Sequence, residues 1–292
     1  MALEPMTRGL WRYRGGAGET GRRAVRTVVV APYGGGSAYS VSELLRHVAP
    51  VAGETLVLQY PGRGPRIGEP PTASLHDLAD QMAQDIDQHA TGNLVLLGHS
   101  LGGLLCFELA HRLARSGRHV ELVVISSALP TASRTLCADE IEARGVEQWV
   151  DLLRAENAVT EEILDDPEML CLAIQALRSD TLLAARHVES PQPLACPMLI
   201  VAGDADPDIT VEQLRGWEEL TVGPATTTLL PGDHFYYRDR AAELGDLIRQ
   251  QLPLLCGTSS APMRLTQGEE GMTHSFRRRD PRPAGPLRGS ES

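Results

Sequence analysis

The chain has 292 residues, of which 42% are hydrophobic. This is enough for one large core, and α/β folds of this length often form a single domain. The formal net charge is -11, from 38 acidic and 27 basic side chains. This balance argues against nucleic-acid binding, which needs a basic surface to meet the phosphates. The five cysteines are scattered without a CxxC pair, so metal and redox roles are not indicated.

Neither secretion nor membrane insertion is indicated. Residues 1–14 lack the apolar core of a signal peptide. No apolar run approaches the roughly 20 residues that cross a bilayer. We therefore expect a cytoplasmic protein that does not enter a membrane.

Short, continuously apolar segments predict strands that are covered on both faces of a parallel sheet. In chain order they are 27–31, 55–59, 94–97, 122–125 and 198–201, with 226–230 as a final candidate. Amphipathic stretches between them predict helices, one capped by Ser74 and ended by Gly92, another over 101–116. Alternating strands and helices indicate right-handed crossovers, and hence a doubly wound, mostly parallel α/β sheet.

The pattern changes in the second half of the chain. Helical stretches over 141–156 and 167–187 follow one another without a strand, which predicts a helical lid inserted between two strands. The last segment is rich in Gly, Pro, Ser, Arg and Glu, which is typical of disorder. The predicted parts are an N-terminal extension over 1–26, an α/β domain over 27–256 with the lid at about 130–193, and a disordered tail over 257–292.

The clearest chemical motif is Gly98-His99-Ser100-Leu101-Gly102, directly after a predicted strand and before a predicted helix. This is the G-x-S-x-G nucleophile elbow in its required strand–turn–helix context, and it predicts an α/β-hydrolase fold. Ser100 is the candidate nucleophile, and the glycines avoid clashes in the tight turn. The amide of Leu101, at the N-terminus of the helix, is placed to help hold an oxyanion. A chance Gly-Ser-Gly turn is the alternative, and the flanking elements disfavour it.

A serine elbow requires an acid and then a histidine later in the chain. His234 follows the last candidate strand and is the candidate base, because the other histidines lie on predicted helices, precede the acid or fall in the tail. The loop Gly203–Asp208 offers three carboxylates. The Gly-x-x-Asp spacing favours Asp206, which would orient the imidazole and stabilise its charged form. Asp204 is the reserve candidate, and Asp208 is expected to be a solvated acid or a helix cap.

The loop after the first predicted strand is rich in glycine. Pro32-Tyr33-Gly34-Gly35-Gly36-Ser37 lets the backbone approach a substrate closely, so we expect it to supply the second oxyanion donor. Phosphate binding is the alternative. It is disfavoured because the loop has neither the Gly-x-Gly-x-x-Gly spacing nor a Gly-Lys-Ser/Thr ending.

Several further segments accompany these motifs. The sequence contains the Gly-rich loop at 32–37, Gln59-Tyr60-Pro61-Gly62-Arg63-Gly64 with Arg66 and Glu69-Pro70-Pro71, the elbow with Phe107-Glu108-Leu109-Ala110, Gly203–Pro207 and Gly232–Phe235. Together these segments resemble those of the type II thioesterases of polyketide and nonribosomal-peptide assembly lines. The resemblance covers about residues 27–252, and its most specific part is the signature Pro61-Gly62-Arg63.

This resemblance implies a serine thioesterase without a metal or organic cofactor. Ser100, Asp206 and His234 would form the catalytic triad, and the amides of Gly34 and Leu101 the oxyanion hole. The implied substrate is an acyl group on the phosphopantetheine arm of an acyl- or peptidyl-carrier protein, cleared in an editing role. The mechanism would acylate Ser100 and then release the acyl group to water activated by His234. The resemblance also implies a monomer.

Some positions depart from the family's pattern. Tyr33 replaces the common His, Leu101 replaces a frequent Met, and Ser42 stands where a Trp is often found. Tyr33 and Leu101 would line the mouth and floor of the acyl site, so we expect them to affect substrate preference. Arg63 is expected to form a structural salt bridge in its loop rather than to contact the substrate.

The acidic net charge bears on the expected partner. Carrier proteins are generally acidic too, so long-range attraction cannot steer the encounter. Docking would then depend on a local patch near the lid, for which Arg134, Arg144 and Arg154 are weak candidates; solvation of the lid helices is the simpler role for them.

Three other functions compete with editing. A small-ester carboxylesterase would share the elbow but not the Pro-Gly-Arg signature. A product-releasing thioesterase is usually fused to a synthase; because no carrier domain is recognised before residue 27, we expect a discrete hydrolytic protein instead. A binding protein built on an inactive hydrolase fold would need a broken triad, whereas all three candidate members are present.

Overall fold

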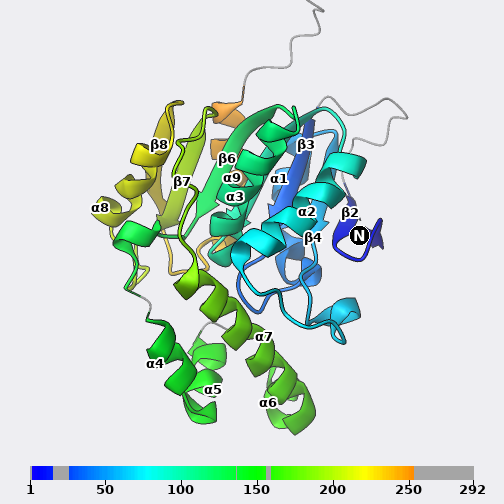
Figure 1. Ribbon diagram of the computed structural model, residues 1–292, viewed down its shortest axis with the longest axis vertical. Coiled ribbons are helices and arrows are strands. Elements are labelled where there is room, and N and C mark those ends of the chain that lie inside the picture. The colour runs from blue at the N-terminus through cyan, green and yellow to red at the C-terminus, as the bar shows by residue number, and fades with distance from the viewer. Residues whose placement is uncertain (1, 16–25, 136, 156–158, 253–292) are drawn as a thin grey trace, which may run out of the picture. The chain divides into compact units, whose positions relative to one another are not determined.

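An eight-stranded sheet with helices on both faces organises the protein (Figure 1). The computed structural model describes residues 2–15, 26–135, 137–155 and 159–252. The predicted tail at 257–292 lies outside these described residues. No described helix combines the length and the apolar character needed to cross a membrane.

The strand order in the sheet is β1-β2-β4-β3-β5-β6-β7-β8. The six strands β4-β3-β5-β6-β7-β8 pair in parallel. β2 is antiparallel to both of its neighbours, β1 and β4. This is the mostly parallel, doubly wound sheet expected from the sequence, and β3 to β8 correspond to the six predicted strands. The strands are β1 (Ala2–Pro5), β2 (Leu10–Arg14), β3 (Arg26–Ala31), β4 (Glu54–Leu58), β5 (Asn93–His99), β6 (Val120–Ser126), β7 (Met198–Gly203) and β8 (Ala225–Leu230).

The first two strands were not predicted from the sequence. β1 and β2 form an antiparallel hairpin, and β2 extends the sheet by pairing with β4. Leu10 is fully buried, and Trp11 and Tyr13 are each 6% exposed. The strand is hard to recognise because Arg12 and Arg14 interrupt its apolar residues, so it lacks the continuous apolar run of the central strands.

Helices cover both faces of the sheet. The main ones outside the insertion are α1 (Ser42–Val48), α2 (Leu75–His89), α3 (Leu101–Arg115) and α9 (Tyr237–Gln251). Val29 and Ala31 of β3 share a core with α2 and α3, whereas Val28 and Val30 share a second core with α1 and α9. Because both faces are buried, the strand is apolar without alternation.

A helical insertion, residues 127–197, separates β6 from β7 and lies at one end of the sheet (Figure 1). Its helices are α4 (Ala138–Ala143), α5 (Val146–Ala155), α6 (Glu161–Asp165) and α7 (Pro167–Arg186). The sequence predicted one helix over 141–156, but the chain leaves helical geometry at Arg144, whose ψ is 129°, and starts again as α5. The insertion has its own apolar core, which includes Ile141, Trp149 and Leu177.

Two glycines allow β3, β5 and α3 to approach one another. A Cβ atom on Gly98 would lie 1.9 Å from the carbonyl oxygen of Gly102. One on Gly102 would lie 2.2 Å from the carbonyl oxygen of Ala31. Both distances are far inside normal atomic contact, which begins near ~3.5 Å. The elbow therefore needs glycine at both positions, as expected from the sequence.

Adding a methyl group at Gly102 should disrupt this junction. Because the nearest atoms are backbone atoms of Ala31 and Pro32, a side-chain rearrangement cannot relieve the overlap. We expect Gly102→Ala to lower the free energy of unfolding by about 3 kcal/mol or more, the upper part of the range for overpacking. Urea denaturation measures this change. Gly68→Ala is the control, since a Cβ there meets nothing within 4 Å; equal losses in the two variants would contradict the prediction.

Candidate active site

Ser100 occupies the tight turn between β5 and α3. Its backbone angles, φ 53° and ψ -120°, are strained for a residue other than glycine. The turn is held by two hydrogen bonds, from the Ser100 amide to the Ser126 carbonyl at 2.7 Å and from the Gly103 amide to the Ser100 carbonyl at 2.8 Å. Ser100 is thereby presented at the N-terminus of α3, where it lines a cavity.

The candidate base and acid form a hydrogen bond. Nδ1 of His234 lies 2.8 Å from Oδ2 of Asp206. The Asp206 side chain is only 1% exposed, whereas that of His234 is 28% exposed. The other carboxylate oxygen of Asp206 accepts a hydrogen bond from the Asp208 amide at 3.1 Å. The carboxylate is thus oriented from one side and holds the imidazole from the other, which favours the tautomer with hydrogen on Nδ1.

The other two acids of this loop have different surroundings. Asp204 is exposed, and its Oδ1 accepts a hydrogen bond from the Gly232 amide at 3.0 Å. It therefore ties the acid loop to the histidine loop. Asp208 is exposed at the cavity, as expected for a solvated acid. It does not cap the next helix, α8 (Val211–Leu214), because Thr210 does so.

Ser100 and His234 line one cavity with a volume of about 460 Å³. This volume falls within the ordinary range for small-molecule sites. Tyr33 and Leu101 also line the cavity, as expected from the sequence, and so does Gly34. The insertion supplies much of the remaining wall. Its contribution includes the apolar residues Ile141, Leu152, Leu177 and Ala184 and the charged residues Arg134, Glu140, Arg144 and Asp180.

A cluster of buried rings lies behind His234, and the sequence analysis did not predict it. The ring centroid of His99 is 5.0 Å from that of His234 and 4.7 Å from that of Tyr237. Burial lowers the pKa of His99 well below its ordinary value, and His234 acts in the same direction. Neutral His99 therefore places no fixed positive charge against His234. The available signals were the position of His99 inside the elbow and the aromatic run Phe235–Tyr237.

Arg63 forms the salt bridge expected from the sequence, but its partner lies far along the chain. Both terminal nitrogens of its guanidinium contact the carboxylate of Asp180 on α7, and the Nη2–Oδ1 distance is 2.8 Å. The two side chains are 8% and 2% exposed. Asp180 was not singled out in the sequence, where it is one polar residue within a helix.

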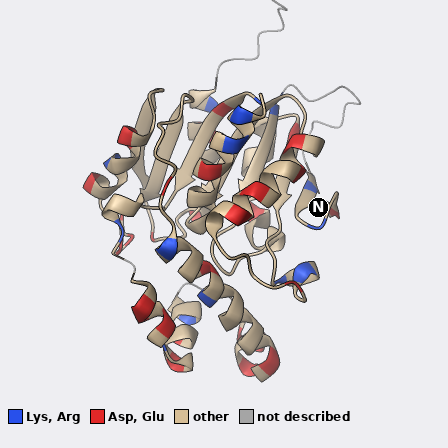
Figure 2. Ribbon diagram, in the orientation of Figure 1, with Lys and Arg blue, Asp and Glu red and all other residues tan. Residues whose placement is uncertain are grey.

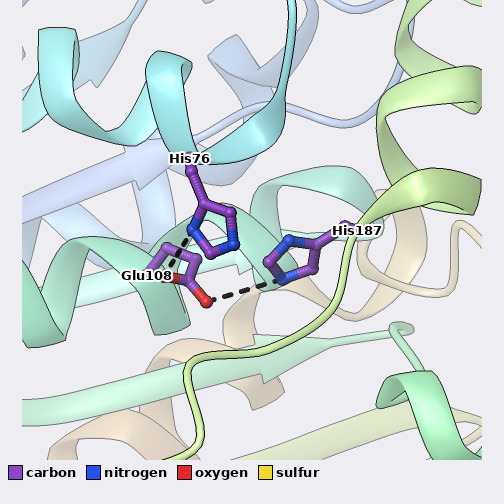
Figure 3. A group of neighbouring side chains, drawn as sticks. All are labelled: His76, Glu108 and His187. Carbon is purple, nitrogen blue, oxygen red and sulfur yellow. Dashed lines mark ion pairs between the residues drawn. The ribbon is translucent and has the colours of Figure 1, made fainter.

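Among the described residues, one group has donor atoms close enough to hold a metal ion. It consists of His76 of α2, Glu108 of α3 and His187, the residue directly after α7 (Figure 3). Nδ1 of His76 lies 3.2 Å from one carboxylate oxygen of Glu108, and Nε2 of His187 lies 3.6 Å from the other. The Glu108 side chain is fully buried.

The Glu108 carboxylate already has other donors. It accepts hydrogen bonds from the amide and hydroxyl of Ser190, at 2.9 and 2.8 Å, and from Nη1 of Arg112 at 2.8 Å. A bound cation would lie beside the Arg112 guanidinium, which opposes it by like-charge repulsion. We therefore interpret the group as an anchor that holds the exit of the insertion onto α3.

This anchor should make the stability of the fold depend on pH. Burial lowers the pKa of His187 from 6.5 to about 4, although Glu108 opposes the shift. Between these values the unfolded chain binds a proton that the folded chain does not, so stability falls as the pH decreases from 6.5 to 4. We expect His187→Gln to flatten this decrease, measured as the urea midpoint at several pH values. His119→Gln, on the surface, is the control; a slope unchanged by His187→Gln would count against the anchor.

Comparison with known proteins identifies the family. Residues 26–252 match the family model described as a thioesterase domain. The gramicidin S biosynthesis protein GrsT of Aneurinibacillus migulanus is 30% identical over 226 residues, which are 77% of this chain and 88% of that protein. The thioesterase PikA5 of Streptomyces venezuelae is 32% identical over 242 residues, 82% of this chain and 84% of that one.

A solved structure shows the same fold. The type II thioesterase BorB from the borrelidin biosynthetic cluster superposes with a TM-score of 0.73 at 29% identity, over 85% of this chain and 98% of that one. This agreement confirms the predicted α/β-hydrolase fold. The region matched by the family model runs from β3 through α9 and includes the elbow, the acid loop and the histidine loop. The chain therefore belongs to the thioesterase family.

Proposed function

We propose that this thioesterase hydrolyses acyl groups from the phosphopantetheine arm of acyl- or peptidyl-carrier proteins, in an editing role within a polyketide or nonribosomal-peptide pathway. One observation supports this chemistry. Ser100 and His234 line the same cavity, and His234 forms a hydrogen bond with the buried carboxylate of Asp206. The substrate class is supported by relatives such as GrsT, whose name places it in gramicidin S biosynthesis.

In the proposed mechanism Ser100, Asp206 and His234 act as a triad without a metal or organic cofactor. Oγ of Ser100 attacks the thioester carbonyl carbon while Nε2 of His234 accepts the hydroxyl proton. The C–S bond breaks, and the arm leaves as a thiol with the proton from His234. Water then attacks the acyl-serine ester, His234 accepts its proton, and this proton returns to Ser100 as the acid departs. Asp206 stabilises the imidazolium formed in each step.

The oxyanion of each tetrahedral intermediate would accept hydrogen bonds from the amides of Gly34 and Leu101. Both residues line the cavity with Ser100. They are also close to each other, because a Cβ on Gly34 would lie 3.9 Å from Cβ of Leu101. Leu101 is the first residue of α3, where amides have no partner within the helix. Such amides stabilise developing negative charge.

The charge of the insertion affects how a carrier protein would dock. Figure 2 shows acidic positions at α6, which contains Glu161, Glu162 and Asp165. The negative charge of α6 would repel an acidic carrier protein. Arg134 is committed elsewhere, since its Nη2 lies 2.9 Å from Glu189 and 3.0 Å from the His187 carbonyl. It is therefore a structural residue.

Arg144 is the better candidate for contact with the arm. It lines the cavity, and its guanidinium lies 5.2 Å from the ring centroid of Trp149. Stacking on an aromatic face leaves the edge of a guanidinium able to donate hydrogen bonds to a phosphate. We propose that Arg144 contacts the phosphodiester of the phosphopantetheine arm.

Replacing Arg144 should weaken carrier binding without altering the chemistry. We expect Arg144→Met to raise KM for an acyl-carrier substrate about fivefold, equivalent to about 1 kcal/mol, with kcat unchanged. Hydrolysis of the corresponding acyl-N-acetylcysteamine thioester, which lacks the phosphate, should be unaffected. Arg154→Met is the matched control, because Arg154 is an exposed arginine of the same insertion. Equal KM changes in both variants would indicate a general charge effect and argue against the contact.

Substitutions in the triad test the proposed mechanism. We expect Ser100→Ala to abolish thiol release from acyl-carrier substrates. Asp206→Asn should lower kcat about 10³- to 10⁴-fold, because the imidazole loses the partner that sets its tautomer. Asp204→Asn should retain most activity, because the Asp204 carboxylate accepts its hydrogen bond from the Gly232 amide rather than from His234. Thiol release, followed with a chromogenic disulfide, measures all three variants.

The same panel separates the competing functions. Matched oxygen esters of the same acyl groups are assayed in parallel. Faster turnover of the oxygen esters would support a carboxylesterase. Activity that survives Ser100→Ala would rule out the serine mechanism, and equal losses in Asp204→Asn and Asp206→Asn would remove the basis for choosing Asp206.

A further inference from the structure

The Pro-Gly-Arg signature frames the glycine-rich loop after β3. The side chains of Gln59, Tyr60 and Arg63 form hydrogen bonds with backbone groups of residues 32–38. The pairs are the Tyr60 hydroxyl with the Pro32 carbonyl at 2.8 Å, Oε1 of Gln59 with the Ala38 amide at 3.0 Å, and Nη1 of Arg63 with the Gly36 carbonyl at 3.4 Å.

The insertion supplies a further contact to this loop. Asp180 of α7 is 2% exposed, and its Oδ2 accepts a hydrogen bond from the Gly35 amide at 2.7 Å. The same carboxylate forms the two-point pair with Arg63. Gly35 has φ +77°, and a Cβ there would lie 3.5 Å from Cα of Leu177. The helix therefore packs directly on the loop.

We propose that Asp180 is a positioning residue, which holds the loop so that the Gly34 amide is directed at the oxyanion; this inference rests on the proposed role of Gly34. The Gly35 amide belongs to the peptide unit that follows Gly34, so fixing it restricts the backbone of Gly34. Three consecutive glycines, residues 34–36, would otherwise sample many conformations. An oxyanion hole stabilises charge only when its donors are held in place before the reaction.

Arg63 makes the carboxylate compatible with this position. Asp180 lines the cavity, where an uncompensated negative charge would oppose an oxyanion. The bidentate guanidinium neutralises that charge. Burial acts to lower the pKa of Arg63, but Asp180 outweighs it and raises that pKa above its ordinary value. Arg63 therefore stays charged beside the carboxylate, which accepts the hydrogen bond from the Gly35 amide.

The test uses a small acyl-N-acetylcysteamine thioester, so that carrier docking does not enter. We expect Asp180→Ala to lower kcat about 10- to 100-fold, somewhat less than removal of an oxyanion donor itself. The inhibition constant of an acyl trifluoromethyl ketone, whose adduct with serine carries an oxyanion, should rise by the same factor. KM and the pH profile of kcat/KM should stay unchanged. Asp180→Asn keeps an acceptor for Gly35 and should lose less activity.

A matched ion pair elsewhere in the fold provides the control. Arg26 and Glu121 form a buried, two-point pair, with side chains 5% and 8% exposed and an Nε–Oε2 distance of 2.6 Å. Arg26 starts β3, whereas the glycine-rich loop follows the end of that strand. We expect Glu121→Ala to lower the urea midpoint by a similar amount to Asp180→Ala. Its kcat and inhibition constant should equal those of the wild type.

The outcomes separate positioning from stability. Wild-type kcat and inhibition constant in folded Asp180→Ala would overturn the proposal, as would equal losses in Glu121→Ala. If Asp180→Ala does not fold, the same comparison is made with the double variant Arg63→Met/Asp180→Leu, which leaves neither an unpaired buried charge nor an acceptor for the Gly35 amide; an unchanged inhibition constant there overturns the proposal. A wild-type enzyme that prefers oxygen esters would instead overturn the proposed function. The variant-to-wild-type ratios, measured on those esters, would still test Asp180.

Discussion

The close backbone approach at the nucleophile elbow is the constraint on which the rest of the site depends. Side chains at Gly98 or Gly102 would overlap backbone atoms of α3 or β3. Their absence lets α3 start immediately beside the end of β3, and Ser100 takes a strained conformation to make the turn. The same approach brings the glycine-rich loop, which continues from β3, next to Leu101. The same packing contact therefore determines the positions of the nucleophile and of the proposed oxyanion donors.

The opposite half of the site is built by a similar contact between the ends of β7 and β8. A Cβ on Gly203 would lie 2.1 Å from the carbonyl oxygen of Asp233. The Asp204 carboxylate accepts a hydrogen bond from the Gly232 amide. These contacts hold the acid loop and the histidine loop together in addition to the hydrogen bond between Asp206 and His234. Asp206 is buried and forms the hydrogen bond with His234, whereas Asp204 is exposed and accepts a hydrogen bond from the Gly232 amide.

The helical insertion contributes more than a cover for the cavity. Glu108 of α3 anchors the chain where it leaves the insertion, by accepting hydrogen bonds from Ser190. In the C-terminal half of α7, Asp180 contacts the glycine-rich loop and Arg63. Two buried carboxylates thus tie the insertion to the core, one at its exit and one at the proposed oxyanion hole. Leu177 and Ala184, which line the cavity, lie on the same helix as Asp180, which we propose to position the loop.

Local sequence patterns determined the central strands, the elbow and the order of the three candidate catalytic residues. These features depend on near neighbours, since a strand covered on both faces is continuously apolar and a tight turn needs glycine. The edge strand β2 escaped detection because arginines interrupt it, and Arg144 ended a helix that periodicity alone would continue. Only the tertiary structure decided which distant side chains meet. Arg63 and Asp180 are 117 positions apart in the chain. Their pairing follows from how α7 packs on the glycine-rich loop, a long-range contact that no local pattern encodes.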